Sequence, residues 1–121
     1  MNTELFKENI IDHYKNPRNF GAVDNPTHKS EVSNVTCGDE IQLTLRVVDG
    51  KIVEIKHITR GCAICTASMS MFSEKVKGME LKKALEISSD EVLEALGINK
   101  DSGRIKCALL AHEGFACAAN L

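Results

Sequence analysis

The chain has 121 residues, of which 43% are hydrophobic and 26% charged, and its formal net charge is -2. This length supports one domain with a single core, and the balanced composition argues against extended disorder. No basic stripe is visible, so we expect no nucleic-acid partner. No apolar stretch approaches the roughly 20 residues that cross a bilayer, so we expect no membrane span. A polar start without an apolar signal core predicts a cytoplasmic protein, or an organellar one after removal of a transit peptide.

The first predicted element is an amphipathic helix from Thr3 to about Lys15. Its apolar residues fall at helical spacing: Leu5, Phe6, Ile10, Ile11 and Tyr14. Asn16-Pro17 ends it, because the residue before proline avoids the α region. A loop rich in Asn, Gly and Pro follows.

Two strands and a hairpin are expected next, after a weaker strand pattern over Lys29 to Thr36. From Glu40 onward apolar and polar residues alternate, and Asp49-Gly50 marks a turn. A two-residue loop would set Glu54 opposite Leu45 and mix polar with apolar residues on both faces. A three-residue loop, Val48-Asp49-Gly50, pairs Leu45 with Val53 and Leu43 with Ile55, so the sequence predicts this register.

The second half of the chain reads as helical. We expect one helix from Cys62 to about Lys77, a short one around Leu81 to Leu85, and one after the capping-box pair Ser88 and Glu91. A last helix is predicted from about Ile105 to Ala119. The sum is an α+β fold, an antiparallel sheet of about three strands with helices packed on one face.

The chain contains five cysteines, which in a reducing compartment indicate metal or sulfur chemistry more often than disulfides. Three of them are predicted at element boundaries: Cys37 between two strands, Cys62 before a helix, and Cys107 at a helix start. Helix dipoles and the nearby Arg60, Arg104 and Lys106 would favour their thiolates, and Asp39 adds a carboxylate. Buried core cysteines are equally consistent with this spacing, at about even odds.

The remaining cysteines and the histidines are weaker candidates. Cys65 completes a C-x-x-C with Cys62 and could be a redox partner or a reserve ligand, but packing beside Ile64 and Met69 is favoured. Cys117 is interpreted as a small apolar residue on the last helix. We expect His57 to face the core, His13 and His28 to lie at the surface, and His112 to point away from Cys107.

Four segments carry a family resemblance. In chain order they are Asp12–Gly21, Cys37–Asp39, Gly61–Ile64 and Arg104–Leu110, and together they sample nearly the whole chain. Each is short, but the four in this order are specific. They resemble the U-type iron–sulfur scaffold family, which comprises IscU, SufU and the amino-terminal domain of NifU.

The resemblance implies that Cys37, Asp39, Cys62 and Cys107 bind iron or a nascent [2Fe-2S] cluster. It implies a non-enzymatic scaffold that receives persulfide sulfur from a cysteine desulfurase and passes clusters to apoproteins. Cys107 is the favoured acceptor thiol, and Cys37 is the next candidate. The alternative is a SufU-like zinc-dependent sulfurtransferase in which zinc occupies the same residues. A structural zinc domain is the third interpretation, and a homodimer stays open.

The chain departs from each subfamily in a different place. Asp101–Arg104 stands where IscU carries the proline-containing motif read by an Hsp70-type chaperone, so that partnership is not favoured. Lys106 precedes the third cysteine, as in SufU, where IscU has histidine. The insertion that SufU carries between the second and third cysteines is missing here, so the chain combines features of both.

Overall fold

A computed structural model describes residues 3–120. Its elements are, in chain order, α1 (Thr3–Lys15), β1 (His28–Asn34), β2 (Asp39–Val48), β3 (Lys51–Arg60), α2 (Ala63–Val76), α3 (Leu81–Leu85), α4 (Ser89–Leu96) and α5 (Ile105–Ala119). The predicted helices and strands are all present within one or two residues of the expected bounds. The capping box of Ser88 and Glu91 is formed, and Gly97 ends α4 in the left-handed region at φ 70°.

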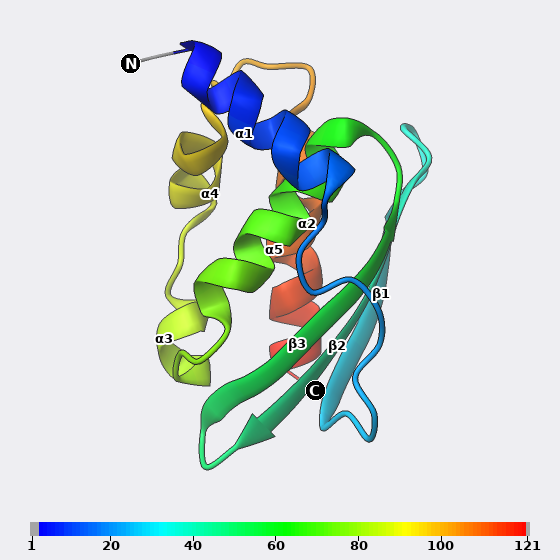
Figure 1. The fold of residues 1–121 in the computed structure, drawn as a ribbon, viewed down its shortest axis with the longest axis vertical. Coiled ribbons are helices and arrows are strands. Elements are labelled where there is room, and N and C mark those ends of the chain that lie inside the picture. Colours follow the sequence, from blue (N-terminus) through cyan, green and yellow to red (C-terminus); the bar gives the residue numbers. More distant parts are fainter. Residues whose placement is uncertain (1–2, 121) are drawn as a thin grey trace.

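The three strands form an antiparallel sheet in the order β1-β2-β3. The helices lie on one side of this sheet, with α2 and α5 next to it and α1, α3 and α4 farther out (Figure 1). Helix α5 contacts β1 and β2, and α2 contacts β3. This arrangement confirms the predicted α+β fold.

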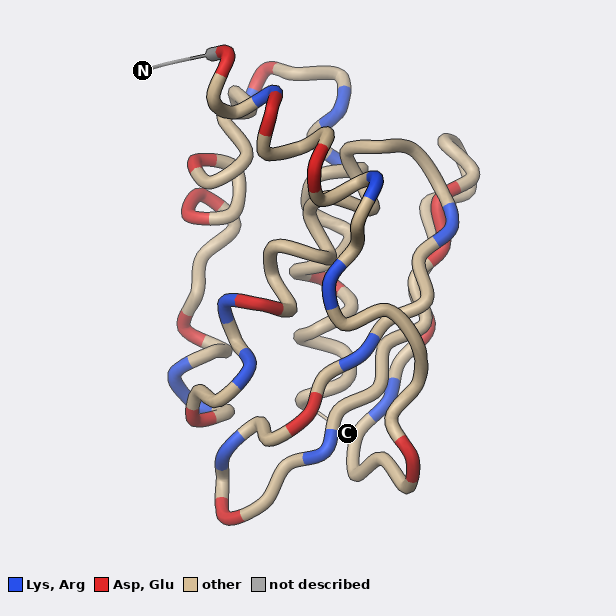
Figure 2. The backbone as a smooth tube through the Cα atoms, in the orientation of Figure 1, with Lys and Arg blue, Asp and Glu red and all other residues tan. Residues whose placement is uncertain are grey.

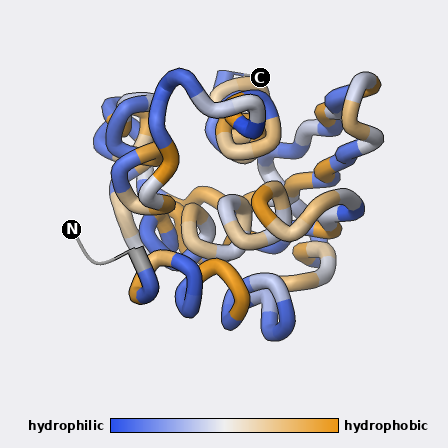
Figure 3. The backbone as a smooth tube through the Cα atoms, turned by 90° about the horizontal axis from the view of Figure 1, so that it is seen from above, coloured by the Kyte–Doolittle hydropathy of each residue, from blue (hydrophilic) through white to orange (hydrophobic). Residues whose placement is uncertain are grey.

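The core lies between the sheet and helices α2 and α5. Its fully buried side chains come from both layers, among them Ile41, Leu43, Leu45, Ile55, Met69 and Phe115. In β2 the residues that alternate with these apolar ones are more exposed, as the period of two requires. Seen from above, hydrophobic and hydrophilic residues alternate in short runs along the helices and strands (Figure 3).

The predicted hairpin register is wrong. Asp49 and Gly50 both have positive φ, 52° and 79°, and form a two-residue turn that pairs Val48 with Lys51. A bulge next to Arg46 and Val47 then shifts the register, so that Leu45 faces Ile55 and Leu43 faces His57. Without the bulge, a two-residue loop would place Glu54 opposite Leu45. The bulge places Ile55 there instead, and it leaves Val53 39% exposed.

Helix α1 buries only part of the face that its apolar residues predict, since Phe6 and Ile10 are half-buried. Leu5, Ile11 and Tyr14 are exposed, whereas His13 is only 6% exposed, so the expectation of a surface histidine is wrong. His13 Nδ1 lies 2.7 Å from Ser70 Oγ of α2, and its Nε2 lies 3.6 Å from Glu74 Oε1. These polar partners on α2 compensate the burial of the ring.

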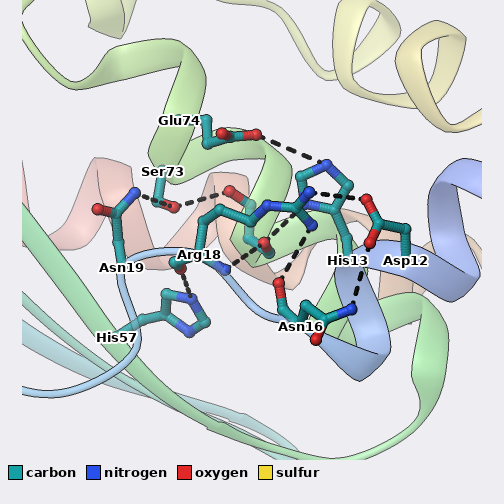
Figure 4. A network of polar contacts seen from close by, with 9 residues as sticks. Asp12, His13, Asn16, Arg18, Asn19, His57, Ser73 and Glu74 are labelled. Atoms are coloured by element: carbon teal, nitrogen blue, oxygen red, sulfur yellow. Dashed lines mark hydrogen bonds and ion pairs between the residues drawn. The ribbon is translucent and has the colours of Figure 1, made fainter.

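The segment after α1, residues 16–19, is hydrogen-bonded to α2 and β3 through a polar network (Figure 4). The N–H of Arg18 donates to Ser70 Oγ at 2.8 Å, and Asn19 Nδ2 donates to Ser73 Oγ at 3.0 Å. His57 Nε2 lies 2.9 Å from the Arg18 carbonyl, and the N–H of His57 donates to the Asn19 carbonyl at 2.9 Å. The segment therefore holds α2 at a fixed position along β3.

Lys, Arg, Asp and Glu are spread over the whole backbone trace, and Lys and Arg form no single large group (Figure 2). This agrees with the absence of basic clusters in the sequence. Among residues 3–120 no helix is both long and apolar enough to span a bilayer.

Candidate metal centre

Cys37 lies in the tight turn that joins β1 to β2. The N–H groups of Cys37 and Gly38 both donate to the Asn34 carbonyl, at 3.2 and 2.9 Å. Gly38 adopts φ 73°, a left-handed conformation that glycine takes without strain. The turn leaves Cys37 exposed. Asp39, two residues after Cys37, is the first residue of β2.

Cys62 is the N-cap of α2. Its backbone is extended, with φ -72° and ψ 166°, and its Sγ accepts the N–H of Cys65 at 3.4 Å. Gly61, just before it, passes close to the turn that contains Cys37 and Asp39. A Cβ at Gly61 would lie 3.0 Å from the Cα of Asp39 and nearer still to the Asp39 carboxylate. Only glycine fits this approach of two chain segments without displacing one of them.

Cys107 lies in the first turn of α5 and is 2% exposed. Its sulfur, the sulfur of Cys37 and a carboxylate oxygen of Asp39 all lie within 4.8 Å of one another. The sulfur of Cys62 is not a member of this group. The structure thus brings together three of the four predicted side chains, and Cys62, whose N–H donates to the Asp39 carboxylate, lies next to them.

Asp39 occupies the centre of this arrangement and is fully buried. Its Oδ1 accepts the N–H of Cys62 at 2.9 Å, while its Oδ2 has no hydrogen-bond partner. A buried carboxylate oxygen without a partner is costly unless a proton or a cation completes it. Three sulfurs and one such oxygen are ligands that both zinc and iron accept, so the residues fit a metal or cluster at this position.

The expectation that the cysteines are poised as thiolates does not hold for Cys107. Burial comes first, followed by the neighbouring side chains of Asp39, Cys62 and Cys37, and together they raise the pKa of the Cys107 thiol far above its ordinary value. Arg104 and Lys106 are exposed and do not offset this. A bound cation would reverse the balance, because a coordinating thiol is deprotonated by the charge of its metal.

The secondary candidates do not belong to the group formed by Cys37, Asp39 and Cys107. Cys65 is fully buried in the core, as favoured, and burial raises its pKa to about 12, with added repulsion from Asp39, Cys62 and Cys37. Cys117 is on α5 as predicted but is exposed. His57 faces the core, and His112 Nε2 lies 2.7 Å from the Ile87 carbonyl rather than near Cys107.

Sequence reasoning missed one residue at the margin of the centre. Asn34 carries a buried side-chain nitrogen, Nδ2, that has no partner. It stands directly opposite Asp39 in the β1–β2 pairing. The only signal in the sequence was its position three residues before Cys37, which did not distinguish it from other turn-forming asparagines.

Comparisons with known proteins agree with the predicted family. The family model of the NifU-like N terminal domain matches residues 5–120. An iron–sulfur cluster assembly scaffold protein IscU of Archaeoglobus fulgidus is 39% identical over 109 residues, which span 90% of this chain and 71% of that protein. The zinc-dependent sulfurtransferase SufU of Bacillus subtilis is 40% identical over 125 residues, covering 88% of this chain and 84% of that protein.

A solved structure has the same fold. The crystal structure of a putative iron–sulfur cluster assembly scaffold protein from Fervidobacterium islandicum superposes with a TM-score of 0.82 at 25% identity. The match covers 98% of this chain and 99% of that one. With a family model matched over nearly its full length and relatives near 40% identity, the chain belongs to the U-type iron–sulfur scaffold family that contains IscU, SufU and the NifU-like N terminal domain.

Proposed function

We propose that the chain is a scaffold domain on which a [2Fe-2S] cluster is assembled and from which the cluster is handed to apoproteins. The observation that carries this proposal is the buried Asp39 carboxylate, which has an oxygen within 4.8 Å of the sulfurs of Cys37 and Cys107 and whose Oδ2 has no hydrogen-bond partner. An oxygen in that position has no other evident partner in the fold, and the sulfurs around it suit iron.

The proposed ligands are Cys37, Asp39, Cys62 and Cys107. Clusters that are to be kept are usually held by four thiolates, whereas three thiolates and a harder carboxylate hold iron less firmly. A weak fourth ligand is a defect in an electron carrier but an advantage in a protein that must release its cluster. Asp39 is therefore the proposed labile ligand.

Sulfur is proposed to arrive from a cysteine desulfurase in the cytoplasm. A thiolate of this chain attacks the outer sulfur of the enzyme's persulfide, a new sulfur–sulfur bond forms, and the enzyme's cysteine leaves as its thiolate. Cys107 is the proposed acceptor, with Cys37 second. Cys37 is the more exposed of the two, so single Cys37→Ser and Cys107→Ser variants, analysed by mass spectrometry for a 32-Da adduct, decide which thiol receives the sulfur.

A second candidate function is that of a zinc-dependent sulfur acceptor. It is favoured by the donor set, since three sulfurs and a carboxylate oxygen can bind zinc tetrahedrally. The similarity to the zinc-dependent sulfurtransferase SufU of Bacillus subtilis supports the same candidate. Here Asp39 would be a ligand that closes the site rather than a labile one.

One experiment separates the two candidates. The protein is purified anaerobically, its iron, zinc and sulfide are measured, and its visible spectrum is recorded before and after addition of desulfurase, cysteine and ferrous iron. A coloured cluster that is lost in Cys62→Ser but kept in the control Cys117→Ser supports the scaffold. Tightly bound zinc with accelerated desulfurase turnover supports the sulfur acceptor, and inert zinc overturns both.

A further inference from the structure

Two buried side-chain atoms among residues 3–120 have no hydrogen-bond partner: Oδ2 of Asp39 and Nδ2 of Asn34. Buried polar groups in folded proteins are nearly always paired, so each exception calls for an explanation. The proposed function accounts for the first atom. It gives no role to the second.

Asn34 and Asp39 are direct partners in the β1–β2 pairing. Side chains directly opposite in an antiparallel pair project from the same face, with Cβ atoms roughly 4.5–5.5 Å apart. The alternating burial of β1 places Asn34 on its less exposed face, and Asp39 is fully buried. The two residues that carry the unpartnered donor and the unpartnered acceptor are therefore neighbours at the same end of the sheet.

The side chain of Asn34 is not needed for the turn that holds Cys37. The turn is closed by the Asn34 backbone carbonyl, which accepts the N–H groups of Cys37 and Gly38. The residue also borders a cavity of about 670 Å³ whose opposite wall includes Ile105 and Lys106, the two residues before Cys107. Asn34 thus lies close to the turn that holds Cys37 and borders the same cavity as the start of α5, which carries Cys107.

We propose that Asn34 is a positioning residue that donates an Nδ2–H hydrogen bond to a metal-bound sulfur of the centre. A bound cation would give both unpartnered atoms a partner. The cation would bind the Asp39 oxygen, and a sulfur bound to that cation would accept the N–H of the Asn34 amide. Hydrogen bonds to ligand atoms orient them and tune the metal. The inference rests on the proposed function, because it requires a metal at this site.

The test uses Co²⁺ and Zn²⁺ on the full chain, since sulfur-to-cobalt charge-transfer absorption reports directly on the ligand sulfurs. Asn34→Leu keeps the side-chain volume and removes the donor, and Asn34→Ala removes both. Ser33→Ala is the matched control, because Ser33 is the neighbouring residue and is exposed. We expect both Asn34 variants to bind Zn²⁺ about 10-fold or more weakly in chelator competition and to shift the cobalt charge-transfer band, with Ser33→Ala unchanged.

Stability of the metal-free chain distinguishes this role from a structural one. Removing an unpartnered buried donor should leave the thermal unfolding temperature unchanged or higher. A lower unfolding temperature in both variants would give Asn34 a structural role and overturn the proposal. Unchanged affinity and absorption would overturn it too. If the unmodified chain bound neither metal, the proposed function itself would fail, a result distinct from a failure of Asn34 alone.

Discussion

The N–H of Cys62 donates a hydrogen bond of 2.9 Å to Oδ1 of Asp39. This bond joins the start of α2 to the start of β2, two points 23 residues apart in the chain. One oxygen of Asp39 is thereby fixed in orientation while the other is left without a partner. A metal ion bound here would therefore meet a carboxylate already held in one orientation.

Replacing Asp39 should slow the release of a cluster. In Asp39→Ala the carboxylate that we propose as the labile ligand is gone, so the reconstituted cluster should transfer to an acceptor apoprotein more slowly than from the unmodified chain. Loss of the acceptor for the Cys62 N–H should also destabilise the fold by about 1 kcal/mol. Visible circular dichroism follows the transfer, with Asp24→Ala, at an exposed site, as the control. Transfer at an unchanged or higher rate would contradict the role of Asp39.

Adding one methyl group at Gly61 should disturb the centre. The new Cβ would lie 3.0 Å from the Asp39 Cα and would collide with its carboxylate. We expect Gly61→Ala to destabilise the chain by about 1–3 kcal/mol in urea unfolding and to weaken zinc binding. Gly103→Ala is the control, because a Cβ there has no atom within 4 Å. Equal behaviour of the two variants would show that the close approach at Gly61 has no consequence.

Acid should destabilise the fold through its buried histidines. Burial lowers the pKa of His57 below its ordinary 6.5, and burial followed by the Arg18 charge lowers the pKa of His13. The folded state therefore resists protonation that the unfolded chain accepts. The contribution of each ring is fully present above pH 6.5 and is lost as the pH falls below that value toward the folded pKa, with a slope of at most about 1.4 kcal/mol per pH unit per histidine.

The neutral tautomer of His57 is set by its partners. Nε2 donates to the Arg18 carbonyl, so Nδ1 accepts the hydroxyl of Thr59 at 2.7 Å. Urea unfolding between pH 7 and pH 5 measures the effect, and His57→Gln should flatten the decline while His28→Asn should leave it unchanged. A decline as steep in His57→Gln as in the unmodified chain would assign the pH dependence to other groups.

The five cysteines should differ in alkylation rate. Iodoacetamide attacks the thiolate, so Cys65, which is fully buried with a pKa raised to about 12, should resist it at pH 8. Cys37 and Cys117 are exposed and should react first. Mass spectrometry of tryptic peptides gives the order, and the denatured chain, in which all five should react, is the control. Labelling of Cys65 at the rate of Cys117 would show that the core opens readily.

Much of the fold could be predicted from local patterns. The alternation of Ile41, Leu43 and Leu45 was enough to predict β2, and the pair Ser88 and Glu91 marked the start of α4. These signals are local because caps and periodicities are satisfied within a few residues. The hairpin register could not be predicted in the same way, because the bulge at Arg46 and Val47 changes which residues of the two strands are paired. Whether such a bulge forms depends on how both strands pack on the helices.

The sequence also marked Cys37, Asp39, Cys62 and Cys107, through their order and their neighbours. It could not show the burial of His13, because a polar residue is expected at the surface unless its partners are known. Ser70 lies 57 residues along the chain, and only the packing of α1 on α2 brings the two together. Asn34 was missed for the same reason, as its unpaired amide exists only in the folded protein.

By itself, then, the sequence determined the elements, the family and the four candidate ligands, because these depend on residue type and short-range spacing. Only the tertiary structure decided that the segments around Asp39, Cys62 and Cys107 meet. It also decided that Oδ1 of Asp39 accepts a hydrogen bond while Oδ2 has no partner. Such convergence depends on how α2 and α5 pack against the sheet. Contacts between distant segments follow from filling the core, which no local pattern encodes.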